Sequence, residues 1–400
     1  MREATRLHCG LIESATLRSA AARLVEVGDS LGIVVADDSK FGHASEKNHE
    51  SHQYFSYRRN SIESLDVLVE ANVPDAKLVL AISESDFSTL VSEEATLIGL
   101  VYANRVHLLA GRLDRIRSWP YVLQALYNNH RVWGAQQINA LKGIDLHQRF
   151  SMNEPLDAAK KFLNTAGFAV FQNVFSTDEI AAFHALIDQR MTEVTPESAD
   201  TWWAENSQQQ MLCCRLTYLD THYPAFEKLH TDPRIRALAA CAEGGLVSSG
   251  ARMDGVFCVT KYSNIIRGVA DLAWHKDCDL GGHRLLCPSV LIGVQLDAAS
   301  QENGQLVYLA GTHQCVNGVE DYQLNLDVLS AVETSPGDVT VHFGHTFHAA
   351  PSPLGDNARR RVLYLSFHPQ ALCQHLGVRE SYNDVLYTKN GALVQHFKEQ

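Results

Sequence analysis

A histidine and an aspartate two residues apart, His275 and Asp277, are the residues of this chain whose types and spacing most directly predict chemistry. A further histidine, His348, follows far downstream. Two imidazoles and one carboxylate can occupy one face of a metal ion and leave the other positions open, as a non-haem Fe(II) centre needs to hold a cosubstrate and O2. His342 and His345 lie close to His348 and compete with it for the distal position. The spacing therefore predicts a metal centre with one of these three histidines.

Three consecutive arginines, Arg359, Arg360 and Arg361, follow the distal histidines. A guanidinium grips a carboxylate through two parallel hydrogen bonds, so an arginine at this place is what a dicarboxylate cosubstrate requires. Lys261, on a predicted strand before the metal pair, could reach the same cosubstrate. A lysine whose stem packs on apolar surface explains that residue equally well.

A His-x-Asp tripeptide is by itself a weak signal. A second copy, His230 to Asp232, precedes Pro233 and a helix-forming stretch, so Asp232 is expected to cap a helix instead. Two histidines and one carboxylate also suit a zinc hydrolase. That alternative leaves the arginines unexplained.

Apolar runs on both sides of these residues predict the strands that position them. They lie at residues 256–259, 289–296, 339–343 and 360–367. If His275 and Asp277 share one strand, their side chains project to the same face. A helix is expected to begin at Thr177. Residues 199–211, which include the tandem Trp202 and Trp203, are expected to form a loop in which the tryptophans either stack on a ring or, more commonly, anchor the loop.

Several motifs occur in a fixed order between residues 156 and 369. Trp274 leads directly into the metal pair, and His348 lies ten residues after Asp338. The other motifs are an opening Phe-Leu-Asn-Thr-Ala-Gly-Phe stretch, a Glu-Asn-Gly-Gln-Leu stretch and a Leu-Ala-Gly-Thr-His stretch, at residues 162–168, 302–306 and 309–313. Together they resemble the phytanoyl-CoA dioxygenase family of Fe(II)/2-oxoglutarate-dependent oxygenases, whose second histidine His348 matches.

This resemblance implies an α+β chain with a C-terminal double-stranded β-helix, a cupin-like jelly roll, and flanking helices. It implies Fe(II) bound by His275, Asp277 and His348, with 2-oxoglutarate as cosubstrate and O2 as the other reactant. The expected enzyme is a dioxygenase that hydroxylates an unactivated C–H bond of a small molecule, a metabolite or natural-product intermediate, and releases succinate and CO2. Desaturation, cyclisation and epimerisation at the same centre remain open alternatives.

Two positions depart from the family pattern. Ala350 stands where the family often has a serine that contacts 2-oxoglutarate, so either Ser352 makes this contact or no residue does. Arg360 fits the start of the family's strand, whereas a strict count from His348 selects Arg359. We therefore expect Arg360 to bind the far carboxylate of 2-oxoglutarate, with Arg359 as the alternative.

The resemblance leaves out the N-terminal region. Short apolar runs at residues 31–36, 65–69 and 77–82 predict buried parallel strands of an α/β layer. Residues 34–42 and 64–69 also look like part of the effector domain of DeoR-type sugar-phosphate regulators. A non-enzymatic sugar-phosphate sensor or regulatory protein is therefore the alternative function of another class.

A polar stretch that ends in Pro155 predicts where the chain divides. Residues 108–144 are expected to form packed helices that join the two halves. We expect an N-terminal α/β or helical accessory region of unknown role at residues 1–152, the oxygenase domain at residues 153–372 and a C-terminal extension at residues 373–400.

Composition narrows the choice of partners and compartment. The formal net charge of -12 argues against nucleic acid as a partner. Nine cysteines without a Cys-x-x-Cys pair are typical of buried thiols in a reducing compartment. No apolar run approaches the ~20 residues that span a bilayer, and the first residues lack the apolar core of a secretory signal. We expect a cytoplasmic enzyme with a small-molecule substrate and no membrane partner, and we leave a homo-oligomer open.

Overall fold

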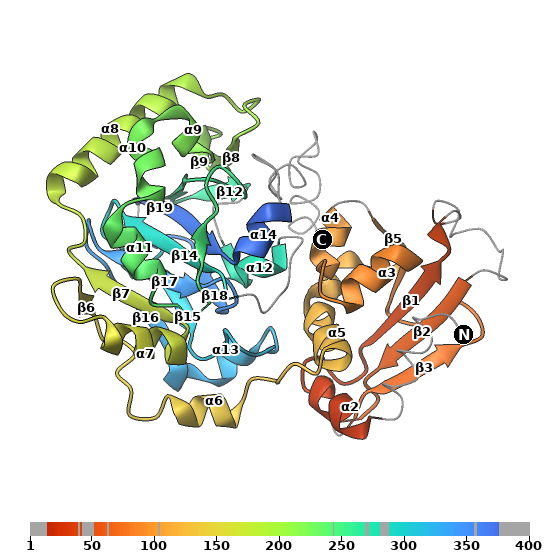
Figure 1. The fold of residues 1–400 in the computed structure, drawn as a ribbon. Coiled ribbons are helices and arrows are strands. Elements are labelled where there is room, and N and C mark those ends of the chain that lie inside the picture. The colour runs from red at the N-terminus through yellow and green to blue at the C-terminus, as the bar shows by residue number, and fades with distance from the viewer. Residues whose placement is uncertain are drawn as a thin grey trace.

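The structure, a computed structural model, is an α+β chain in which helices flank β-sheets (Figure 1). It describes residues 14–38, 41, 52–61, 64–102, 105–242, 244–268, 272–280, 288–355 and 358–375. Ser39, Lys40 and Gly42 of the DeoR-like stretch lie outside the described residues, as does most of the C-terminal extension. None of the described helices has the length and apolar character needed to cross a membrane.

The N-terminal region is built on a five-stranded sheet. Its order is β3 (Asp66–Glu70), β2 (His52–Arg58), β1 (Ser30–Ala36), β4 (Leu78–Ser83) and β5 (Val106–Gly111). The apolar runs correctly predicted β1, β3 and β4, but only β1 and β4 are parallel, and the other neighbours are antiparallel. The helices of this region are α2 (Ala15–Ala22), α3 (Glu84–Val91), α4 (Leu97–Tyr102), the 3-10 helix η3 (Leu113–Ser118) and α5 (Trp119–Tyr127).

The prediction of helices throughout residues 108–144 was wrong at its start. Leu108 and Leu109 lie on β5, which pairs with β4 along the edge of the sheet. The helices come later, as η3, α5 and α6 (Ala135–Ala140). Two consecutive leucines are compatible with a helix or a strand. Here they form a strand because β4 offers an edge with which they can pair.

The C-terminal region contains a large sheet and a small sheet. The large sheet runs β12 (Ile265–Arg267), β8 (Thr201–Asn206), β9 (Met211–Leu216), β11 (Phe257–Tyr262), β19 (Arg359–His368), β14 (Val290–Gln295), β17 (Val339–Phe343), β7 (Phe168–Gln172) and β6 (Phe150–Ser151), with β10 (Val247–Ser248) also paired to β19. The small sheet runs β13 (Leu272–His275), β18 (His348–Ala350), β15 (Leu306–Leu309) and β16 (Leu329–Val332). All four predicted strands around the candidate site are present.

Helices accompany the sheets of this region. They are α7 (Asp157–Ala166), α8 (Thr177–Glu193), α9 (Leu219–His222), α10 (Pro224–Glu227), η4 (Lys228–His230), α11 (Pro233–Ala239), α12 (Asp277–Leu280), η5 (Gln301–Asn303), α13 (Asp321–Leu324), η6 (Leu326–Val328) and α14 (Gln370–His375). Helix α8 begins as predicted, with Ser176 and Glu179 in a capping box. Asp232 caps α11, which confirms that the second His-x-Asp is structural.

The loop expected at residues 199–211 is instead the hairpin of β8 and β9. Trp202 lies under the guanidinium of Arg215 on the partner strand, 4.5 Å from the ring centroid. The indole N–H of Trp203 donates to Thr201 Oγ1 at 2.9 Å. Both tryptophans therefore hold the hairpin in place, and the polar residues around them concealed its strands from a reading of the sequence.

The N-terminal and C-terminal apolar cores are joined by hydrogen bonds between residues 131–133 and residues 310–316. The backbone of Trp133 donates to Val316 O at 2.7 Å, and Val316 N donates to Arg131 O at 2.9 Å. The indole of Trp133 donates to Ala310 O at 3.2 Å. Val316 packs in the N-terminal core, whereas Trp133 packs in the C-terminal core. Side chains near this junction therefore pack in both cores, and Leu141 and Phe150 also belong to the C-terminal one.

Candidate metal centre and cosubstrate pocket

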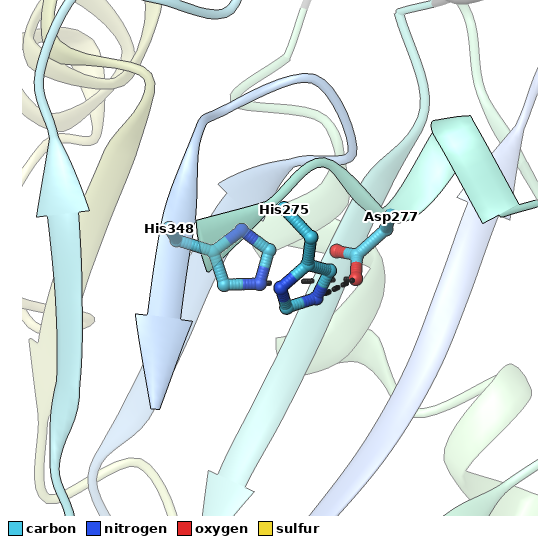
Figure 2. Close-up of side chains that lie close together, drawn as sticks. All are labelled: His275, Asp277 and His348. Carbon is cyan, nitrogen blue, oxygen red and sulfur yellow. Dashed lines mark ion pairs between the residues drawn. The ribbon is translucent and has the colours of Figure 1, made fainter. Parts of the chain in front are cut away.

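The two predicted ligand histidines are directly opposite each other in the small sheet. His275 ends β13 and pairs with His348, the first residue of β18. Asp277 Oδ1 lies 3.3 Å from His275 Nε2 and 3.7 Å from His348 Nε2. One ligand atom from each residue lies within 4.8 Å of the others, and Figure 2 shows the three side chains converging. The structure thus brings together the three residues named from the sequence.

The way in which Asp277 reaches this group differs from the prediction. His275 and Asp277 do not share a strand, because β13 ends at His275 and Asp277 is the first residue of α12. The chain changes from strand to helix here, and the carboxylate lies beside the two imidazoles (Figure 2). Two-residue strand periodicity is therefore not the reason that these side chains meet.

Both ligand histidines are oriented by backbone carbonyls. Nδ1 of His275 lies 2.7 Å from Ala273 O, and Nδ1 of His348 lies 2.8 Å from Thr346 O. A proton on each Nδ1 satisfies these carbonyls and leaves the Nε2 lone pair for a metal. Burial lowers the pKa of His348 to about 3, which keeps it neutral, the form that binds metal. The donor set and its orientation therefore fit an Fe(II) ion.

A third histidine, His342 on the large sheet, contacts the carboxylate of Asp277. His342 Nε2 lies 3.1 Å from Asp277 Oδ2, and its Nδ1 lies 3.2 Å from the hydroxyl of Tyr308. If the tyrosine donates to Nδ1, the Nε2 proton is available to Asp277. This contact engages Oδ2, while Oδ1 faces His275 and His348. His342 therefore contacts the second oxygen of the carboxylate, and the centroid of its ring lies 4.8 Å from that of His348.

Electrostatics keep Asp277 in its anionic form. Burial acts to raise the pKa of Asp277, but His348, His275 and His342 together hold that pKa well below its usual value. An ionised carboxylate binds a cation without first losing a proton. His345, the third histidine that competed for the distal position, is buried and does not belong to the group.

The three arginines have three different environments. Arg359 is exposed, and Arg361 is bound by Asp188, at 2.6 Å, and by Asp297. Arg360 is 2% exposed, and its Nη2 donates to Gly304 O at 2.8 Å. Its Nε and Nη1 have no hydrogen-bond partner among the residues that the structure describes. A buried guanidinium with two nitrogens that lack a partner is suited to bind a carboxylate.

The surroundings of Arg360 connect it to the metal group. Tyr364 and Tyr308 both lie near its guanidinium, and Tyr308 is the residue that contacts His342. Tyr308 also pairs with His348 across the small sheet. Polar side chains thus connect Arg360 on β19 to Asp277 on α12 through Tyr308 and His342.

Lys261 lies beside Arg360, since the two residues are directly paired between β11 and β19. It is buried, and its ammonium donates to Ala350 O and, at 2.8 Å, to Pro351 O. Those carbonyls follow His348 on β18, so Lys261 holds the strand that carries the distal histidine. The ammonium of Lys261 is therefore itself buried and hydrogen-bonded to the backbone. It is not an exposed ammonium on a buried stem.

The Glu-Asn-Gly motif is explained by Gly304. Its φ is +76°, and a Cβ atom there would lie 2.5 Å from Pro351 O and 3.3 Å from the Lys261 stem. A larger residue would therefore displace the Pro351 carbonyl, which accepts from Lys261, and would also press on the lysine stem. Ser352, the alternative to the family serine, is exposed.

Sequence reasoning missed the roles of His342, Tyr308 and Gly304. His342 was visible as a histidine on an alternating strand, but nothing in the sequence showed which carboxylate it would contact.

A hollow adjoins this region through Lys261 and the strand that carries His275. It is lined by Trp202, Cys214, Arg215, Val259, Thr260, Lys261 and Leu272.

Several solved structures are similar to part of this chain. The chain resembles in fold AviO1 from Streptomyces viridochromogenes Tue57, with 23% identity over 55% of this chain and 97% of that one and a TM-score of 0.44. EctD from S. alaskensis with bound Fe has 17% identity, 56% and 82% coverage and a TM-score of 0.45. HygX from Streptomyces hygroscopicus, with nickel and 2-oxoglutarate bound, has 20% identity, 54% and 88% coverage and a TM-score of 0.41. No curated protein matches the sequence.

The sequence profile of phytanoyl-CoA dioxygenase (PhyH) matches residues 163–362, half of the chain. The matched segment includes the three residues of the metal group and Arg360. With iron, 2-oxoglutarate and O2 as its cofactor and cosubstrates, the chain is an enzyme that belongs to the phytanoyl-CoA dioxygenase family of Fe(II)/2-oxoglutarate-dependent dioxygenases.

Proposed function

We propose that this enzyme hydroxylates an unactivated C–H bond of a small molecule and couples that reaction to the conversion of 2-oxoglutarate into succinate and CO2. The observation that carries the proposal is the pairing of two sites. One is an oriented His-Asp-His group, and the other is a buried guanidinium with two uncommitted N–H groups. A zinc hydrolase needs the first site but has no use for the second.

His275, Asp277 and His348 would hold the iron through two neutral imidazoles and one carboxylate oxygen. When bound, iron supplies, together with 2-oxoglutarate and O2, the oxidising power that breaks the C–H bond. Arg360 binds the far carboxylate of 2-oxoglutarate through its Nε and Nη1 groups, and its positive charge offsets the charge of that carboxylate. Lys261 holds β18 and supports the position of His348.

Burial gives this arrangement its specificity for a dicarboxylate. Arg360 is almost inaccessible to water, so a molecule that enters without a carboxylate leaves the guanidinium without a partner. A cosubstrate with one carboxylate near the metal group and one at Arg360 satisfies both sites at once. This requirement selects against monocarboxylic 2-oxo acids.

The substrate is proposed to enter over the hollow that Trp202 and Leu272 line. This hollow combines an aromatic face, aliphatic side chains and the Arg215 guanidinium. An organic molecule with both apolar and polar groups suits such a lining. Trp202→Ala should therefore raise the apparent KM for substrate more than it changes the requirement for 2-oxoglutarate.

The scaffold of this site is proposed to be a double-stranded β-helix made of the large and small sheets, within an oxygenase domain at residues 153–372. Residues 1–152 are proposed to be an accessory region. The seven described cysteines are all free and buried, which supports a reducing compartment such as the cytoplasm.

The experiment is an anaerobic titration with Fe(II) and 2-oxoglutarate, followed by a screen of metabolites for succinate release that depends on O2. Product mass then separates the outcomes, because hydroxylation adds one oxygen atom, desaturation removes two hydrogens and epimerisation leaves the mass unchanged. Tight binding of sugar phosphates without succinate release would favour the regulatory alternative. Activity that zinc restores and iron does not would favour a hydrolase.

A further inference from the structure

Lys276, the residue between the two metal ligands His275 and Asp277, is buried although it carries an ammonium group. It is 1% exposed, and its Nζ donates to Cys315 O at 2.6 Å and to Thr312 O at 3.2 Å. Desolvation of an ammonium is costly unless it is hydrogen-bonded, so these contacts fix the lysine and the backbone that carries it. The segment between the two ligands is therefore tied to residues 312–315.

The segment that accepts these hydrogen bonds is itself held by the N-terminal region. Val316, the residue after Cys315, forms two backbone hydrogen bonds with Arg131 and Trp133, and its side chain packs in the N-terminal core. The ring of Tyr121 on α5 lies 5.9 Å from Lys276 Nζ, within the range of a cation–π contact. The ammonium of Lys276 thus contacts both the C-terminal region, through two carbonyls, and the N-terminal region, through Tyr121.

Charged residues of both regions interact near Lys276. Asp321 follows the segment, and burial raises the pKa of its carboxyl, while Arg23 of the N-terminal region and Lys276 both oppose this rise. Arg23, the residue that follows α2, and Lys276 therefore both act on the Asp321 carboxyl. A shift of the N-terminal helices would change the environment of the ammonium directly.

We propose that Lys276 is a positioning residue that couples the N-terminal region to the metal centre. Its hydrogen bonds hold the backbone between His275 and Asp277 against residues 312–316. The N-terminal region in turn holds residues 312–316 through its hydrogen bonds to Val316. The accessory N-terminal region then supports the geometry of the metal centre through Lys276. This inference rests on the proposed metal role of His275 and Asp277.

The test measures Co(II) binding to full-length variants, with Co(II) used as the probe in the absence of 2-oxoglutarate. Lys276→Met keeps most of the side-chain volume and should weaken Co(II) binding about 10–100-fold, the usual effect of losing a residue that supports a ligand. The visible absorption spectrum of the bound Co(II) should also change, because the ligand geometry relaxes. Lys161→Met, at an exposed position on α7, is the matched control and should match the wild type.

A second variant tests the coupling from the N-terminal side. Tyr121→Leu should weaken Co(II) binding about 2–5-fold, the loss expected for a modest cation–π contact. In the Lys276→Met background the same change should have no further effect, because the ammonium through which it acts is gone. Thermal unfolding without metal shows whether each variant is folded.

The outcomes separate this inference from the proposed function. If His348→Ala binds Co(II) as tightly as the wild type does, the metal centre itself is wrong. If His348→Ala loses binding while Lys276→Met keeps wild-type affinity and spectrum, the positioning role alone is refuted. Equal effects of Tyr121→Leu in both backgrounds would show that Tyr121 does not act through Lys276. If Lys276→Met fails to fold, wild-type Co(II) affinity in Tyr121→Leu refutes the coupling.

Discussion

Replacement of Arg360 by alanine should separate the binding of 2-oxoglutarate from the binding of metal. Arg360 is buried and donates one hydrogen bond to Gly304 O, and its Nε and Nη1 groups are uncommitted among the described residues. Loss of one member of a buried, charge-assisted pair costs about 2–5 kcal/mol. At about 1.4 kcal/mol for each factor of ten, the affinity for 2-oxoglutarate should fall roughly 30- to 4000-fold.

The assay is the stabilisation of the metal-loaded protein by 2-oxoglutarate. A ligand at about 100 times its Kd stabilises the folded state by about 2.7 kcal/mol. If the Kd rises 100-fold, the same concentration gives only about 0.4 kcal/mol. The thermal shift should therefore nearly disappear in Arg360→Ala, while Co(II) binding stays close to that of the wild type.

Arg359→Ala is the matched control for this prediction. Arg359 is the adjacent residue on β19, but it is exposed, so its removal should leave the response to 2-oxoglutarate unchanged. If Arg359→Ala abolished the thermal shift and Arg360→Ala preserved it, the assignment of the cosubstrate pocket would be refuted.

Three further predictions follow from the same structure. His348→Ala should abolish iron-dependent succinate release without unfolding the protein, while His345→Ala should keep the ability to bind Co(II); the reverse result would mean that the wrong distal histidine was chosen. Burial lowers the pKa of His313 to about 4 from an ordinary value of ~6.5, so between these values the unfolded chain binds more protons than the folded one. His313 alone should therefore add about 3 kcal/mol to the free energy of unfolding as pH increases from 4 to 6.5, and denaturant titrations of His313→Gln should show a flatter profile. A fragment that starts at Asn153 should aggregate, because it exposes the apolar residues that pack against the N-terminal region; a monomeric fragment with full Co(II) affinity, measured by light scattering and titration, would contradict this expectation.

The chemistry-bearing residues were predictable because their types are restrictive. Few functions need two histidines, a carboxylate and a buried arginine together, and the strands that carry His348 and Arg360 have strong apolar patterns. The strand-to-helix change after His275 was not predictable, because strand β13 is short and Leu272, Ala273 and Trp274 carry no signal for its end. The ligands converge through tertiary structure rather than through the two-residue period of a strand.

Residues whose role depends on a distant partner escaped prediction. His342 meets Asp277, and Lys276 meets the carbonyl of Cys315, across separations that no local pattern encodes. The N-terminal strand β2 was missed because it begins with His52 and Gln53, and its apolar residues are interrupted by Ser56. In each case, the contact is made by a partner that only the folded chain supplies.

The central claim is that one site holds both Fe(II) and 2-oxoglutarate, through the His-Asp-His group and Arg360. Its most direct test is an anaerobic titration of the full-length protein with Fe(II) and then 2-oxoglutarate, monitored by visible absorption, followed by exposure to O2 and measurement of succinate. We predict a new absorption band that requires both additions, and succinate release that is lost in His348→Ala and in Arg360→Ala. Formation of the band and of succinate at wild-type levels in either variant would contradict the account.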